Sequence, residues 1–321
     1  MFKLIVATAL AAAAWPALAD TFPTRSVTLV VPFSAGGPTD VVARHLAVAM
    51  GKSLGQTVVV DSRPSSGGIV GSEAVVRAAA DGYTLLIHNI GMSTLSALAP
   101  ELKFDPTKDF SPIGEVVDVP MILVGKKNLP ANTMPELVGY LRDHQKSINL
   151  SNAGIGTASH LCGMLLMNRL GLALTTVPYK GAAPAMTDLQ GGQVDLLCDQ
   201  ITTTLQPIQS QRVKAYGATT QKRLAALPEL PTLAEQGMDQ FEITVWHGVY
   251  APKNTPKEVV DRLSSALRAA LADPTFRDSM GKLGAVPVSD ERASPAGLSQ
   301  KLAAQIAVWS PLIKQSEAYL R

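Results

Sequence analysis

The chain repeats one local order, a short apolar strand, a glycine-rich loop and a helix, and this order most strongly limits how it can fold. Residues 27–31 are rich in β-branched side chains and predict a buried strand. Residues 32–38 hold two prolines and two glycines, so they continue neither a strand nor a helix. Thr39 or Asp40 then caps a predicted helix that runs through Met50 and ends at Gly51.

The same order continues to residue 87 and starts again in the middle of the chain. Strands at 58–60 and 83–87, joined by a helix at 72–80, complete a βαβαβ series, which favours a parallel sheet covered by helices. A capping box at 133–136 opens the second series. Its expected helices are at 133–146, from the end of the loop 151–157 through residue 170, and at 184–190. Its expected strands are at 148–150, 174–179 and 194–198. A further capping box at 255–258 predicts a helix to residue 272.

Two long extended stretches, 116–124 and 241–250, join the two series. We interpret them as strands that cross between two lobes, with a cleft and a hinge between the lobes and the C-terminal segment returning to the first. The predicted first lobe comprises residues 20–119 and 246–321, and the second lobe comprises residues 120–245.

The N-terminus has the pattern of a secretory signal peptide. Lys3 precedes an apolar run at 4–14, and Ala17-Leu18-Ala19 offers the small residues of a cleavage site. The run is shorter than the roughly 20 residues that a membrane span needs. We therefore expect cleavage after Ala19 and export to the periplasm. The net charge of +2 and the absence of a basic stripe argue against nucleic-acid binding.

Three strand-to-helix loops predict a site for a small anion. They cover residues 34–40, 89–94 and 151–160, are rich in glycine and small polar residues, and contain no Lys or Arg. A helix N-terminus offers unpaired N–H groups and a partial positive charge, which suit a carboxylate. Each loop alone could be a plain tight turn, but the three together favour a site. On this hypothesis Gly156→Val obstructs the site sterically, and Thr157→Ala weakens binding by roughly 1–2 kcal/mol.

Enzyme signatures are weak or missing. Gly154-Ile155-Gly156 begins like a dinucleotide-binding fingerprint, but Ser159 occupies the position of its third glycine. There is no Gly-x-Ser-x-Gly elbow or Walker loop. The five histidines have no metal-ligand spacing. We predict no catalytic residue, no metal and no cofactor. Asp40 is interpreted as a helix cap, and Asp199 as an acid lining the cleft or, alternatively, stabilising a turn.

The two cysteines, Cys162 and Cys198, are expected on one edge of the second lobe. Cys162 falls near the start of a helix and Cys198 at the end of a strand, and in a parallel α/β lobe helix starts and strand ends share an edge. Export places both thiols in an oxidising compartment. We therefore predict a disulfide between them. The alternative is two separate buried thiols.

Several motifs resemble the Bug-type receptors of tripartite tricarboxylate transporters. The first-loop motif at 32–40 resembles theirs closely, and further matches follow in the family's order over nearly the whole exported chain: 63–64 with 67–68, 81–86, 154–161, 177–181 with 191–195, 246–248 and 251–252. The resemblance implies a type II periplasmic-binding-protein fold. In this α/β fold each of two lobes is a mostly parallel sheet flanked by helices, and the ligand closes between them. Ser34-Ala35 and Asn254 depart from the proline and glycine usual in the family.

We expect a monomeric, non-enzymatic periplasmic receptor that captures a small carboxylate and delivers it to the membrane permease subunits of a tripartite transporter. The alternative is a periplasmic sensor that signals through a histidine kinase; an α/β hydrolase is disfavoured. The ligand could be an amino acid, a di- or tricarboxylate or an aromatic acid. The candidate ligand-binding residues are Phe33, Ser34, Ala35, Gly36, Thr39, Asn89, Ser151, Gly156, Thr157, His160, Lys180, Asp199 and Trp246.

Overall fold

The computed structural model describes residues 22–99 and 101–316. The predicted signal peptide, residues 1–19, lies outside these ranges. Within them, no helix combines the length and the apolar composition that a membrane crossing requires.

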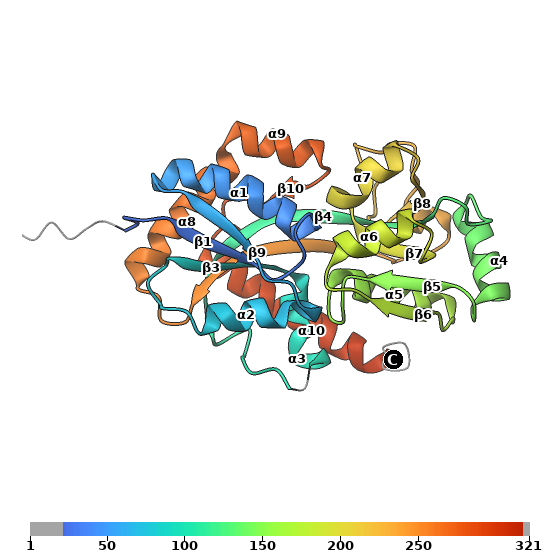
Figure 1. The fold of residues 1–321 in the computed structure, drawn as a ribbon, viewed down its shortest axis with the longest axis horizontal. Helices are drawn as coiled ribbons and strands as arrows, with labels where there is room; N and C mark the ends of the chain where they lie inside the picture. Colours follow the sequence, from blue (N-terminus) through green and yellow to red (C-terminus); the bar gives the residue numbers. More distant parts are fainter. Residues whose placement is uncertain (1–21, 100, 317–321) are drawn as a thin grey trace, which may run out of the picture.

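Within these ranges ten strands form one continuous curved sheet whose two ends belong to different lobes (Figure 1). In the first lobe β2, β1 and β3 are parallel, and β9 runs antiparallel beside β3. In the second lobe β6, β5 and β7 are parallel, and β4 runs antiparallel beside both β7 and β8. The strands are β1 (Val27–Val31), β2 (Val58–Ser62), β3 (Thr84–Asn89), β4 (Phe110–Lys126), β5 (Asn149–Asn152), β6 (Thr175–Pro178), β7 (Leu196–Gln200), β8 (Val213–Ala218), β9 (Thr244–Pro252) and β10 (Val286–Pro287).

Strand β4 joins the lobes. It pairs with β9 as far as Pro120, and with β7 from Met121 onward. The boundary expected at residues 119/120 lies within one residue of this change of partner. We retain the division into 20–119 plus 246–321 and 120–245 as a proposal.

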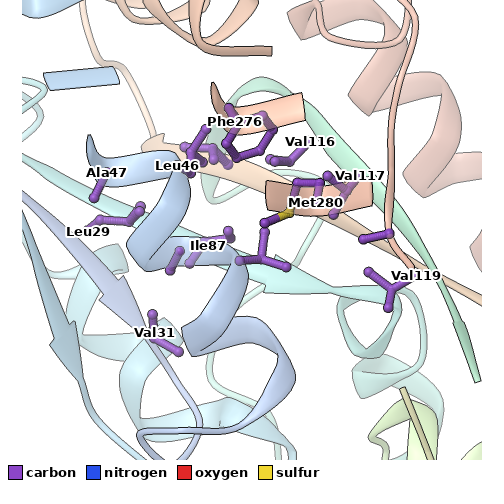
Figure 2. Packing of buried hydrophobic residues seen from close by; sticks show 14 of the residues in the cluster. Leu29, Val31, Leu46, Ala47, Ile87, Val116, Val117, Val119, Phe276 and Met280 are labelled. Atoms are coloured by element: carbon purple, nitrogen blue, oxygen red, sulfur yellow. The ribbon is translucent and has the colours of Figure 1, made fainter. Parts of the chain in front are cut away.

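Helices cover both faces of the sheet. In the first lobe α1, α8 and α9 lie on one face and α2 and α10 on the other (Figure 1). Figure 2 shows side chains of α1, α9 and strands β1, β3 and β4 meeting in one apolar cluster, which continues along β4 into the second lobe. The helices are α1 (Pro38–Leu54), α2 (Ile69–Val76), α3 (Leu95–Leu98), α4 (Met134–His144), α5 (Ala158–Leu170), α6 (Ala182–Gln190), α7 (Ile201–Gln209), α8 (Lys257–Ala272), α9 (Pro274–Lys282) and α10 (Pro295–Gln315).

The C-terminal segment returns to the first lobe, where an ion cluster holds it against β4. Arg292, just before α10, donates hydrogen bonds to Glu115 and to Asp118 of β4. Glu115 is completely buried, and this burial raises the pKa of its carboxyl. Because a buried carboxylate needs a charged partner, Arg292 is the residue that allows Glu115 inside the fold.

Helix α1 corrects two expectations. It continues through Gly51 and ends at Leu54, because Gly55 adopts a left-handed φ of 70° that a helix cannot continue. Its N-cap is Gly37 rather than Thr39 or Asp40. The Asp40 carboxylate instead accepts hydrogen bonds from the Gly36 N–H and from the Arg44 side chain, so it braces the loop from within.

Two other helix starts also differ. Helix α2 begins at Ile69 and ends at Val76, earlier than the predicted 72–80. The capping box expected at 255–258 does not form at α8: the Thr255 hydroxyl donates to the Pro252 carbonyl, and Pro256 occupies the N-cap position. The capping threonine at α4 was predicted correctly, since the Thr133 hydroxyl accepts from the Glu136 N–H.

Candidate ligand-binding site

A small cavity lies where the strand ends of both lobes meet, and its volume is about 20 Å³. Its walls come from the loops that follow β1, β3 and β5 and from the segments that lead into α6 and α7. The lining residues are Phe33, Pro38, Thr39, Asn89, Ala153, Thr157, Ala158, Ser159, Ala182, Asp199 and Gln200. A cavity of this size holds about one water molecule, so a larger ligand requires the surrounding loops to move apart.

Four helices begin at the cavity wall. The first residues of α1, α5 and α6 line it, and Gln200, the N-cap of α7, lines it as well. Helix N-termini offer unpaired N–H groups and a partial positive charge, although there is no Lys or Arg among the lining residues. The arrangement suits an anion held by amides and hydroxyls.

Two buried polar atoms of the lining have no hydrogen-bond partner among the described residues. They are the Ser159 hydroxyl, in the first turn of α5, and the Gln200 side-chain oxygen, at the end of β7. Buried polar atoms are normally paired. These two atoms are therefore available to a ligand.

Asp199 is the only charged side chain among the lining residues. It is buried, and it accepts a hydrogen bond from the Thr203 hydroxyl at 2.6 Å. Burial raises the pKa of this carboxyl to about 6. Strongly shifted acids cluster at functional sites, so the position of Asp199 in the lining favours contact with ligand.

The lobes touch each other beside the cavity through close backbone approaches. The Thr94 hydroxyl of the first lobe donates to the Gly156 carbonyl of the second at 2.8 Å. The Ile155 N–H donates to the Ser66 hydroxyl at 3.2 Å. Gly181 fits against Ser34 so closely that an added Cβ would lie 2.2 Å from the serine Oγ. The structure therefore has the two lobes closed over the site.

We expect Gly67→Ala to weaken ligand binding about tenfold by opposing this closure. An alanine Cβ at position 67 would lie 2.8 Å from the Ile155 carbonyl oxygen in the opposite lobe, and overpacking of this kind costs about 1–3 kcal/mol. Gly55→Ala is the matched control, because φ is 70° there against 65° at Gly67 and an added Cβ meets no atom within 4 Å. Calorimetric titration should show weaker binding for Gly67→Ala alone. Wild-type affinity in both variants would mean that the bound lobes do not meet here.

The predicted site residues fall into three groups. Phe33, Thr39, Asn89, Thr157 and Asp199 line the cavity. Five others are outside the lining and make contacts elsewhere. Ser34 contacts Gly181, and the Ser151 hydroxyl donates to the Leu196 carbonyl. His160 accepts a hydrogen bond from the Gly156 N–H, and Trp246 is buried in the core around β9. Ala35, Gly36 and Lys180 are exposed and also outside the lining.

The structure gives the two substitutions expected to probe the glycine loop effects on the local fold in addition to any effect on binding. The Thr157 hydroxyl donates to the Gly154 carbonyl at 2.7 Å and accepts from the His160 N–H, so it caps α5, and its loss costs helix stability first. An added Cβ at Gly156 makes only ordinary contacts, the nearest at 3.7 Å. Valine there would also be strained by the left-handed φ of 82°.

Ser159 and Gln200 were missed from the sequence. Each is adjacent to a recognised signal: Ser159 lies two residues after the Thr157 cap, and Gln200 follows Asp199 at a strand end. The rule that ligands meet carboxyl ends of parallel strands would have included both.

The structure joins Cys162 and Cys198 by a disulfide, with the Cα atoms 6.1 Å apart. The bond links the second turn of α5 to β7, immediately before Asp199 and Gln200. Two parts of the cavity wall are thereby tied together covalently.

A two-lobed α/β fold with a polar cavity at helix N-termini between the lobes defines a solute-binding protein of the periplasmic type. The model of the tripartite tricarboxylate transporter receptor family matches residues 42–317. The chain belongs to this family, whose members are binding receptors.

Individual relatives agree with this assignment. A protein of Agrobacterium vitis, described as a UPF0065 protein in the TAR-I ttuE-ttuC' intergenic region, is 44% identical over 94% of this chain and 88% of its own. The structure of the periplasmic binding protein BugD is 49% identical, with a TM-score of 0.90 over 92% of this chain and 99% of that one. MatC of Rhodopseudomonas palustris, solved with bound malate, is 36% identical, with a TM-score of 0.87 over 91% of this chain and all (100%) of that one.

Proposed function

We propose that this protein is a monomeric periplasmic receptor that binds a small organic carboxylate between its lobes and delivers it to the permease subunits of a tripartite transporter. Export follows cleavage of the signal peptide after Ala19. The main support for this proposal is that four helix N-termini meet at one cavity whose lining residues include no Lys or Arg. The malate bound to a relative of similar fold supports a small dicarboxylate.

Asp199 narrows the class of ligand within this proposal. An ionised Asp199 repels a ligand carboxylate but accepts a hydrogen bond from a hydroxyl or an ammonium group. Ser159 and the helix N-termini face the carboxylate, and Asp199 faces the donor. The favoured ligand is therefore a short hydroxy or amino dicarboxylate.

A thermal-shift and calorimetry panel tests the proposal. L-malate, L-aspartate, succinate, citrate and benzoate are compared with succinamide, a neutral control of similar size. We expect at least one carboxylate to raise the melting temperature while succinamide does not, and L-malate or L-aspartate to bind more tightly than succinate. A panel in which no carboxylate binds would refute a carboxylate receptor.

Deletion of the cognate permease genes distinguishes delivery from sensing. Uptake of the binding carboxylate should then stop in cells that still export the receptor. If uptake persisted and only transcription responded to the ligand, the histidine-kinase alternative would replace delivery. No specific observation on the molecule favours that alternative.

A further inference from the structure

Three buried side chains from three elements meet at one edge of the cavity. Thr39 of α1 and Asn89 of β3 line it, whereas His247 of β9 lies outside the lining. Asn89 and His247 are direct partners in the β3–β9 register. The Thr39 hydroxyl oxygen lies 3.1 Å from Asn89 Nδ2 and 3.3 Å from His247 Nε2. The hydroxyl of the cavity-lining Thr39 is thus contacted by the Asn89 and His247 side chains.

The orientation of the Asn89 amide is set by its other contact. Its Oδ1 accepts a hydrogen bond from the Gly91 N–H at 3.0 Å. The Nδ2 group therefore faces Thr39, and it can only donate. One lone pair of the Thr39 oxygen is occupied by this bond.

His247 is completely buried, and burial lowers the pKa of its ring to about 3, so the ring is neutral and carries one N–H. Nδ1 makes no well-aligned hydrogen bond to any of the described residues. The Val245 backbone lies beside the ring and partly offsets the effect of burial on its pKa. A proton on Nδ1 would be a buried donor without a well-aligned acceptor, which is rarer and costlier than an unpaired acceptor. The proton belongs on Nε2, where it is donated to Thr39.

With two N–H groups donating to its oxygen, the Thr39 hydroxyl has no acceptor for its own hydrogen among the described residues. Because Thr39 lines the cavity, this hydrogen is available to a ligand there. We propose that His247 is a positioning residue that turns the Thr39 hydroxyl into a fixed donor for the ligand carboxylate. This inference rests on the proposed carboxylate site. The opposite tautomer would draw the Thr39 hydrogen away and leave only lone pairs facing the carboxylate, which would repel it.

A double-mutant cycle tests the coupling, with L-malate as the first probe and the tightest-binding panel member as the second. We expect His247→Phe to weaken binding about tenfold when Thr39 is present and to have no further effect in the Thr39→Val background, because a hydrogen bond to a charged group is lost only once. His247→Gln, which keeps an N–H donor, should restore most of the affinity. Equal losses from His247→Phe in both backgrounds would show a merely structural role and overturn the proposal.

Nitrogen-15 NMR of the ligand-free wild-type protein tests the same inference without any variant. With histidine labelled selectively, the buried ring of His247 should show a protonated Nε2 and an unprotonated Nδ1, and a protonated Nδ1 would overturn the proposal. This readout does not depend on knowing the ligand. Failure of the carboxylate panel is therefore distinguishable from failure of the positioning role.

Discussion

Replacing Cys162 and Cys198 together with alanine lowers the free energy of unfolding by about 4 kcal/mol. The two residues are 36 positions apart, and the chain-entropy model assigns a crosslink of that span about this value. For a chain of this length the melting temperature falls by roughly 6 °C. Urea unfolding monitored by circular dichroism measures the change.

Reduction of the wild-type protein is the matched control, because it breaks the crosslink without removing either sulfur. Dithiothreitol should shift the wild-type midpoint toward that of the double variant and leave the variant unchanged. Ligand affinity should fall as well, since the bond ties α5 to the strand end that carries Asp199. Insensitivity of the wild type to reductant, together with two titratable thiols after denaturation, would contradict the crosslink.

Between pH 4 and neutral pH, the ligand-free Asp199→Asn variant should gain up to about 3 kcal/mol of stability relative to the wild type, because only the wild type loses stability as the carboxyl ionises. Burial raises the carboxyl pKa to about 6 in the folded state, against about 3.9 when unfolded, and each pKa unit is worth about 1.4 kcal/mol. The folded protein holds the proton more tightly, so the contribution of Asp199 to stability is complete below pH 4. It is lost as the pH rises to 6 and stays constant above that.

Urea unfolding of both proteins between pH 4 and 7.5 measures this difference. The stability of the wild type should fall more steeply with pH than that of Asp199→Asn, and the variant should bind the tightest panel carboxylate more weakly. A gap between the two proteins that does not change with pH would contradict a buried carboxyl. Higher stability with weaker binding is the mark of a residue retained for function.

Most elements of this fold could be predicted from the sequence, because their signals are local. The strand at 27–31 and the helix ending at Gly171 follow from β-branched runs, caps and a left-handed glycine. The error at the end of α1 arose because two local signals compete. Gly51 and Gly55 both can end α1, and only the backbone at Gly55, with φ of 70°, does so.

The candidate site was only partly predictable. Sequence reasoning found the loops and Asp199, since anion-binding helix starts and strand ends carry recognisable residues. It could not exclude Lys180, which is exposed, or Trp246, which is in the core. Side-chain direction depends on how each loop packs on its neighbours, and no spacing rule encodes that.

The sequence by itself determined the series of strands, loops and helices and the family resemblance, and it led to the prediction of an anionic ligand. Each depends on local backbone chemistry and on residue order. Only the tertiary structure decided that four helix starts meet at one cavity, that Gly67 and Gly181 approach the opposite lobe, and that His247 lies behind Thr39. These contacts join residues up to 208 positions apart. Such contacts are set by the packing of whole elements around β4 and β9, so they exist only once the chain has folded.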